Sequence, residues 1–163
     1  MESNGEVIRV GMAQTAVGKA PITLVTFGLG SCVGIAAWDP RVKVGGLGHV
    51  MLPDSTQARL TDNAAKFADT SIPDLVNQME RLGAIRRRLI IKIAGGAQMF
   101  NLFNDERFSI GRRNVEAVKA ALERLNLKIA GEDTGGSYGR TLLFDTETGE
   151  VTIRTIDHGE KAL

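Results

Sequence analysis

The chain has 163 residues, of which 43% are apolar and 24% charged, and this composition excludes disorder of the whole chain. Twenty Lys and Arg against 19 Asp and Glu leave a net charge of +1, so no overall field attracts nucleic acid or an anionic membrane. One cysteine excludes an internal disulfide, and one cysteine with two histidines argues against a Cys/His zinc site. The first residues lack the basic and apolar segments of a signal peptide. We therefore expect one cytoplasmic domain, residues 1–163, without metal or cofactor.

Glycine is the residue type in clear excess. There are 19 glycines, about 12% of the chain against a usual share near 7%. They are neither periodic nor linker-like, and most of them follow segments that are expected to be strands. This placement predicts tight turns and close backbone approach at strand ends.

The first third of the chain is predicted to be β-structure. Four segments have the β-branched or alternating apolar residues typical of strands, namely residues 7–12, 22–27, 32–38 and 44–52. Short connections separate the last three segments, and one of them contains the turn pair Asp39-Pro40. Connections this short favour an antiparallel meander over helical crossovers.

The apolar pattern then changes to helical spacing. Apolar residues recur at three- and four-residue steps over residues 64–82, which predicts one face of an amphipathic helix. Asp62 or Asn63 is a suitable N-cap, and Gly83 is a suitable residue just after the helix. Pro73 lies inside this stretch, where it either kinks the helix or begins a second one.

The remaining elements complete the predicted fold. We expect a buried strand over residues 88–94, a second helix from about Asn114 to Leu125 and a short strand over residues 127–130. Two further strands form a hairpin around a turn that ends at Gly149. Together these elements predict an α+β domain in which two or three helices pack on one mixed, mostly antiparallel sheet.

Cys32 is the only thiol and follows a glycine-containing turn at the start of a predicted strand. A thiol in this position has backbone N–H groups beside it, and such donors stabilise an oxyanion by about 2.7–4 kcal/mol each. The alternative is a structural role, because free cysteine is often a small buried apolar residue. The residue pattern leaves both interpretations open.

His49 and Thr26 are the candidate partners of this thiol. If residues 32–38 and 44–52 pair as a hairpin, His49 comes close to Cys32, and a base within reach makes a thiol reactive. Thr26, in the preceding strand, could accept the other ring N–H of His49 and so select its tautomer. The alternatives are a histidine bonded to a backbone carbonyl and a threonine chosen for its β-propensity.

Other candidate motifs are weaker. Gly28-Leu-Gly30 lacks the third glycine and the following helix of a dinucleotide-binding loop, which excludes that function. No spacing of acidic residues matches a metal-binding motif.

Five sequence blocks together are more specific than any single residue. They are Thr26-Phe-Gly-Leu-Gly-Ser-Cys32-Val, Gly46-Leu-Gly-His49-Val-Met-Leu-Pro53, Ala94-Gly-Gly-Ala-Gln-Met-Phe100, Ile110-Gly-Arg-Arg-Asn114-Val-Glu-Ala-Val and Glu132-Asp-Thr-Gly-Gly136. In these blocks, and in the same order over nearly the whole chain, the sequence resembles the CheD family of chemoreceptor glutamine deamidases. Phe27, Gly48 and Pro73 depart from the usual pattern of the family.

The resemblance implies a cysteine hydrolase with the triad Cys32, His49 and Thr26. It implies deamidation of receptor glutamines to glutamate through a thioester, with glutamyl methylesterase activity as a second reaction. We expect backbone N–H groups at Gly30, Ser31 and Cys32 to hold the oxyanion. The implied fold is a layered α/β sandwich with two long helices, similar to the deamidase domain of cytotoxic necrotizing factor toxins.

The resemblance also implies two kinds of partner. Methyl-accepting chemotaxis receptors are the implied substrates, and the CheC phosphatase is the implied binding partner. A glutamine on a receptor helix needs a shallow groove with an apolar rim. Candidates for this rim are Met51, Met99, Phe100 and Phe103. The alternative functions are a binding module that regulates CheC with little catalysis and a redox-sensing thiol.

Overall fold

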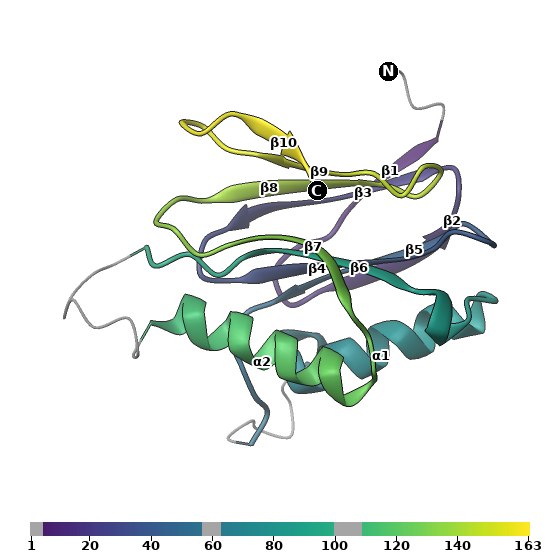
Figure 1. Ribbon diagram of the computed structural model, residues 1–163, viewed down its shortest axis with the longest axis horizontal. Helices are drawn as coiled ribbons and strands as arrows, with labels where there is room; N and C mark the ends of the chain where they lie inside the picture. Colours follow the sequence, from purple (N-terminus) through teal and green to yellow (C-terminus); the bar gives the residue numbers. More distant parts are fainter. Residues whose placement is uncertain (1–4, 57–62, 100–108) are drawn as a thin grey trace.

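The computed structural model describes residues 5–56, 63–99 and 109–163. These residues form three layers, namely a layer of helices, a central sheet that the helices cover on one side and a second sheet on the other side (Figure 1). The class is α+β, with two α-helices and two mixed five-stranded sheets in the described part of the chain.

The central sheet has the strand order β2-β5-β4-β6-β7. Its strands are β2 (Thr15–Lys19), β5 (Val44–Val50), β4 (Val33–Asp39), β6 (Ile90–Gly95) and β7 (Ile129–Thr134). All neighbours are antiparallel except β6 and β7, which are parallel and connected through α2. Strands β4 and β5 are buried along nearly their whole length because both faces of this sheet are covered.

The outer sheet has the strand order β1-β3-β8-β9-β10. Its strands are β1 (Glu6–Arg9), β3 (Ile22–Leu29), β8 (Arg140–Asp145), β9 (Val151–Arg154) and β10 (Glu160–Ala162). The pair β1 and β3 is parallel and the other pairs are antiparallel. One face of this sheet packs on the central sheet, and neither helix covers the other face (Figure 1).

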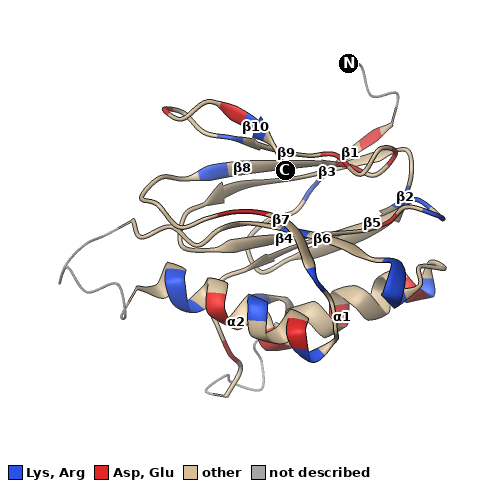
Figure 2. Ribbon diagram, viewed as in Figure 1, with Lys and Arg blue, Asp and Glu red and all other residues tan. Residues whose placement is uncertain are grey.

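The helical layer consists of α1 (Ala68–Arg81) and α2 (Ile110–Arg124). Short 3₁₀ turns, η1 (Ala64–Lys66) and η2 (Arg86–Arg88), lie on either side of α1. Acidic and basic residues are interspersed along α2, whereas the only basic residue of α1 is its last, Arg81 (Figure 2). Within the described ranges, no helix is long and apolar enough to cross a membrane.

Two apolar clusters fill the two spaces between the layers. The cluster under the helices includes Ile35, Ile72, Leu75, Ile93, Val118 and Leu122. The cluster between the sheets includes Leu24, Cys32, Leu47, Leu142, Phe144 and Ile153. Because side chains alternate along a strand, the even-numbered residues of β4 face the outer sheet and the odd-numbered ones face the helices. Side chains at the even-numbered positions of β4 therefore point into the space between the two sheets.

The expectation of a single sheet is wrong. Strands β4 and β5 pair as the expected hairpin, but β3 leaves their sheet and pairs with β1 and β8 instead. The partner β8 lies more than a hundred residues further along the chain, and a local apolar pattern contains no information about such pairing. Strands β2 and β10 were not expected, because both are short and contain few apolar residues.

The expected helices exist but their starts differ. Asn63 caps η1, and α1 begins only at Ala68, so Pro73 lies inside α1 rather than at the start of a second helix. Gly83 follows α1 with a φ of +101°, as expected for a residue just after a helix. Helix α2 begins at Ile110 with Ser109 as its cap, four residues before the expected start.

Candidate active site

The hairpin of β4 and β5 brings the candidate nucleophile and base to one face of the central sheet. His49 on β5 lies opposite Gly34 on β4, and Cys32 directly precedes β4. Cys32 and Gly34 are two residues apart and so point to the same face, which faces the outer sheet. Cys32 and His49 are therefore diagonal neighbours on adjacent strands, a relation that typically separates Cα atoms by about 7–8 Å.

The outer sheet contributes Thr26, which lies in β3 and contacts the imidazole. The Thr26 hydroxyl donates to the Val10 carbonyl at 2.6 Å, and its oxygen lies 2.7 Å from His49 Nδ1. A hydroxyl has one proton and a carbonyl oxygen can only accept, so the bond to Val10 uses that proton and the Thr26 oxygen accepts from the ring. Nδ1 of His49 therefore carries the proton, and Nε2 has a free lone pair. The hydrogen-bond network thus determines the tautomer.

His49 is held neutral by its surroundings. It is 0% exposed, and burial lowers its pKa from 6.5 to about 4. Among the residues that the structure describes, Nε2 has no hydrogen-bond partner. A neutral imidazole with an unpaired lone pair is the form that can accept a proton near pH 7.

Cys32 is also in its neutral form. The residue is 8% exposed, and burial raises the pKa of its thiol, although its own backbone N–H acts in the opposite direction. Because Nε2 of His49 has no partner in the described chain, the thiol and the imidazole are not hydrogen-bonded to each other in this state. The arrangement is a neutral thiol near a neutral base, not a preformed thiolate–imidazolium pair.

The segment before Cys32 is fixed by backbone hydrogen bonds. The Gly30 carbonyl accepts from the N–H of Ala97, and the Cys32 carbonyl accepts from the N–H of Gly96, both at 2.8 Å. The Gly30 N–H donates to the Gly28 carbonyl at 2.9 Å, so in this conformation it is engaged within the turn. This geometry does not favour Gly30 as an oxyanion donor.

Asn114 is a buried polar residue to which the sequence assigned no role in the site. It lies on α2, is 0% exposed, and its side-chain amide donates to the carbonyls of Ser31 and Met51, each at 2.9 Å. Ser31 precedes the candidate nucleophile, and Met51 follows the candidate base by two residues. The only signal in the sequence is its place in the Ile110-Gly-Arg-Arg-Asn114 block, near the expected start of the second helix.

The family model described as CheD chemotactic sensory transduction matches residues 51–155 of the chain. The probable chemoreceptor glutamine deamidase CheD of Clostridium novyi is 50% identical over 162 residues, which cover 98% of this chain and 99% of that protein. The protein of the same name from Caldanaerobacter subterraneus is 51% identical over 162 residues, 99% of each chain. That from Syntrophomonas wolfei is 48% identical over 159 residues, 97% of this chain and 99% of its own.

The chain belongs to the CheD family. The resemblance in the five sequence blocks is thereby confirmed. A solved structure, Neisseria meningitidis protein NMB0706 of family-model DUF152, matches with a TM-score of 0.48 and 8% identity over 82% of this chain and 63% of that chain.

The residues expected to form an apolar rim have different environments. Met99 is 46% exposed and lies beside the Gly30 backbone, so it is available at the surface near the turn before Cys32. Met51 is half-buried and packs against the cluster between the sheets. Phe100 and Phe103 lie outside the described residues. Phe27, which was not expected in the rim, is 47% exposed next to Thr26, with the Arg9 guanidinium 4.7 Å from its ring centre.

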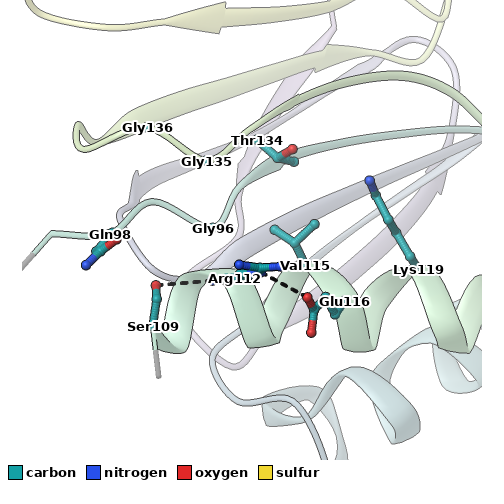
Figure 3. A pocket seen from close by; sticks show the side chains of 10 residues that line it. All are labelled: Gly96, Gln98, Ser109, Arg112, Val115, Glu116, Lys119, Thr134, Gly135 and Gly136. Carbon is teal, nitrogen blue, oxygen red and sulfur yellow. Dashed lines mark hydrogen bonds and ion pairs between the residues drawn. The ribbon is translucent and has the colours of Figure 1, made fainter. Parts of the chain in front are cut away.

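A cavity of about 340 Å³ lies beside the N-terminal half of α2 (Figure 3). Among the described residues, those that line it are Gly96, Gln98, Ser109, Arg112, Val115, Glu116, Lys119, Thr134, Gly135 and Gly136. Its two cations have acidic partners, Arg112 with Glu116 and Lys119 with Glu132, each at 3.1 Å. None of the candidate triad residues lines this cavity, so it is separate from the candidate active site.

Proposed function

We propose that this protein hydrolyses the side-chain amide of glutamine residues on chemoreceptors, with Cys32 as nucleophile, His49 as base and Thr26 as the residue that orients the base. The observation that carries the proposal is the hydrogen-bond chain from His49 Nδ1 through Thr26 to the Val10 carbonyl. These hydrogen bonds leave the lone pair of Nε2, which has no partner among the described residues, on the same face of the sheet as the only cysteine. The names of the full-length relatives support the choice of a glutamine side chain as substrate.

The first half of the reaction forms a thioester. Nε2 of His49 takes the proton of the Cys32 thiol as the sulfur attacks the amide carbon of the glutamine. The tetrahedral intermediate collapses when its C–N bond breaks. The imidazolium returns its proton to the leaving nitrogen, which departs as ammonia and leaves a glutamyl thioester on Cys32.

The second half hydrolyses the thioester. Neutral His49 accepts a proton from a water molecule while the water oxygen attacks the thioester carbon. The C–S bond then breaks. The thiolate of Cys32 recovers a proton from the imidazolium, and the product is glutamate. Overall, one amide and one water give one carboxylic acid and one ammonia. A glutamyl methyl ester would follow the same course with methanol as the leaving group, which is the proposed second reaction.

Burial explains how this pair can work without a preformed thiolate. Burial disfavours the charged forms of both Cys32 and His49, so the proton transfer takes place as the substrate carbon is attacked. The charge that develops then lies on the carbonyl oxygen, and we assign its stabilisation to the backbone N–H groups of Ser31 and Cys32. The Gly30 N–H is the weaker candidate because it donates to Gly28.

We place the reaction in the cytoplasm, on the surface of a receptor helix. Met99 and Phe27 are exposed beside the turn that precedes Cys32, and they are suited to contact small apolar residues of such a helix. The CheC phosphatase is the proposed second partner, for which this same apolar surface is our candidate. Met51 is half-buried and packs against the cluster between the sheets, so we propose that it supports the rim residues and does not contact the substrate.

The test is ammonia release and intact mass of a chemoreceptor cytoplasmic fragment from the same organism. We expect ammonia together with the mass change of an amide-to-acid conversion, and neither product with the Cys32→Ala variant. Cys32→Ser is the matched control, since it retains a polar group of similar size but a far weaker nucleophile. Substantial turnover by Cys32→Ala would contradict the proposed nucleophile. No conversion by the wild-type protein would contradict the deamidase and favour a CheC-binding module, which titration with CheC would test.

A further inference from the structure

We propose that Asn114 is a positioning residue for this reaction, which orients the Ser31–Cys32 peptide so that the Cys32 N–H faces the oxyanion. The inference rests on the proposed function, because it assigns a task to a residue that touches neither substrate nor thiol. It starts from the two hydrogen bonds of the Asn114 amide and from the planarity of the peptide bond.

The first hydrogen bond acts through one peptide plane. The Ser31 carbonyl and the Cys32 N–H belong to the same trans peptide, so they point in opposite directions. Asn114 Nδ2 holds the Ser31 carbonyl at 2.9 Å from the side of α2. The Cys32 N–H must therefore point away from α2, towards the side of the sheet on which the thiol lies. Burial raises the pKa of the thiol, and this N–H lies close enough to its own sulfur to offset part of that rise.

The second hydrogen bond reaches the strand that carries the base. The same Nδ2 donates to the Met51 carbonyl at 2.9 Å, two residues after His49. A single planar amide group thus connects the segment before Cys32 to the end of β5. This connection fixes the spacing of the candidate nucleophile and base, although the two residues do not hydrogen-bond to each other.

The backbone of α2 is brought unusually close to allow this contact. A side-chain carbon added at Gly111 would lie 2.6 Å from the Gly96 carbonyl oxygen, closer than real contacts allow. Gly111 is on the first turn of α2 and Gly96 follows β6, so the helix rests directly on the chain beside Cys32. The Gly111 and Asn114 pair of the same sequence block therefore forms one structural unit.

The hydrogen bonds of Asn114 determine how its side-chain amide is oriented. Both partners of Nδ2 are carbonyls, which only accept, so the orientation of the amide is determined. Its Oδ1 is buried and has no partner among the described residues. An unsatisfied buried acceptor costs about 1–3 kcal/mol. The amide nevertheless suits this position, because an apolar side chain would leave the carbonyls of Ser31 and Met51 without this donor.

The test compares Asn114→Ala with Val118→Ala, which removes an equally buried side chain one turn further along α2. For receptor deamidation we expect Asn114→Ala to lower kcat about 10- to 100-fold with KM changed less than about 2-fold, because an oxyanion donor acts in the transition state. Val118→Ala should lose comparable stability while its kcat stays within about 2-fold of wild type. Asn114→Ser, which keeps one donor on a shorter side chain, should be intermediate.

A second readout needs no receptor. Alkylation of Cys32 by iodoacetamide, followed against pH, reports the pKa of the thiol. His49 is the titratable group beside it and, with a pKa of about 4, stays neutral across this range. We expect the alkylation profile of Asn114→Ala to shift to higher pH, because the Cys32 N–H would no longer be held towards the sulfur. Val118→Ala should leave the profile unchanged.

The outcomes separate this inference from the proposed function. Unchanged kcat and an unchanged alkylation profile in folded Asn114→Ala or Asn114→Ser would overturn the inference while the deamidase stands. An equal loss of kcat in Val118→Ala would also overturn it, since general destabilisation would then suffice. A shifted alkylation profile with no receptor conversion by the wild type would support the orientation of the Ser31–Cys32 peptide by Asn114 and would refute the deamidase.

Discussion

Each end of the β4–β5 hairpin contains a buried polar side chain, and the two side chains differ in how fully they are hydrogen-bonded. Asp39 ends β4 and is 0% exposed, and both of its oxygens accept hydrogen bonds. Its partners are the Arg88 guanidinium, at 2.8 Å for the shortest bond, and the backbone N–H groups of Arg41 and Ile85. His49, near the opposite end, is also 0% exposed, but its Nε2 has no partner among the described residues.

The pKa values follow the same contrast. Burial alone would raise the pKa of Asp39, but the hydrogen bonds from Arg88 and the backbone outweigh it and lower that pKa. Burial lowers the pKa of His49 to about 4, and no charged partner counteracts it. Asp39 is thus charged and satisfied, whereas His49 is neutral and has an unused acceptor. The first pattern stabilises a fold, and the second retains a reactive group.

The largest expected effect is on catalysis at the His49 end. His49→Gln keeps a polar side chain but removes the base, and we expect receptor deamidation to fall roughly 10²–10⁴-fold. Folding should be preserved because Nε2 has no partner in the described part of the chain. Ammonia release measures the activity and circular dichroism the fold. Deamidation by this variant at the wild-type rate would show that the His49 end of the hairpin is not the catalytic one.

A substitution at the Asp39 end of the hairpin should lower the stability of the protein and not its catalytic rate. Asp39→Ala leaves Arg88 and two backbone N–H groups without their acceptor, and we expect a loss of about 3 kcal/mol in the free energy of unfolding. Urea denaturation measures this loss. Activity per folded molecule should stay at the wild-type level, so a specific loss of kcat at this end would break the comparison.

Thr26 tests the same contrast from the side of the base, because it is the hydrogen-bond partner of the reactive His49. Thr26→Val has nearly the same shape but cannot accept from Nδ1, so the imidazole loses the contact that selects its tautomer. We expect about a 10²-fold loss of kcat, measured by ammonia release. Thr26→Ser keeps the hydroxyl and should retain most activity, and equal losses in the two variants would contradict the tautomer argument.

The smallest expected effect is in the pH dependence of stability. The pKa of His49 is about 4 in the folded protein against its ordinary value of 6.5, so between these values the unfolded chain binds the extra proton. The neutral form thus stabilises the fold fully above about pH 6.5, and this contribution decreases as the pH falls towards 4. From pH 8 to pH 5 the loss should be about 2 kcal/mol.

Urea denaturation of wild type and His49→Gln at the two pH values isolates this contribution. The difference between the proteins belongs to His49, because the other titratable groups are common to both. Parallel pH profiles for the two proteins would mean that His49 is not held neutral by burial.

Much of this protein is readable from local patterns in the chain. The period of the apolar residues located the helix that contains Ile72 and the strands that contain Ile35 and Ile93, because burial of one face imposes that period. The single cysteine, Cys32, and the five sequence blocks led to the CheD family and to the candidate triad. These features depend on residues that are close in sequence or on motifs that can be recognised one at a time.

Tertiary structure decided what depends on residues distant in sequence. The split into two sheets follows from the pairing of β3 with β8, which moves Thr26 across the space between the sheets to face His49. The tautomer of His49 depends on the Val10 carbonyl, and the assignment of Asn114 depends on two carbonyls 83 and 63 residues away. Hydrogen bonds of this kind depend on where the chain folds back, and neither periodicity nor composition encodes that position.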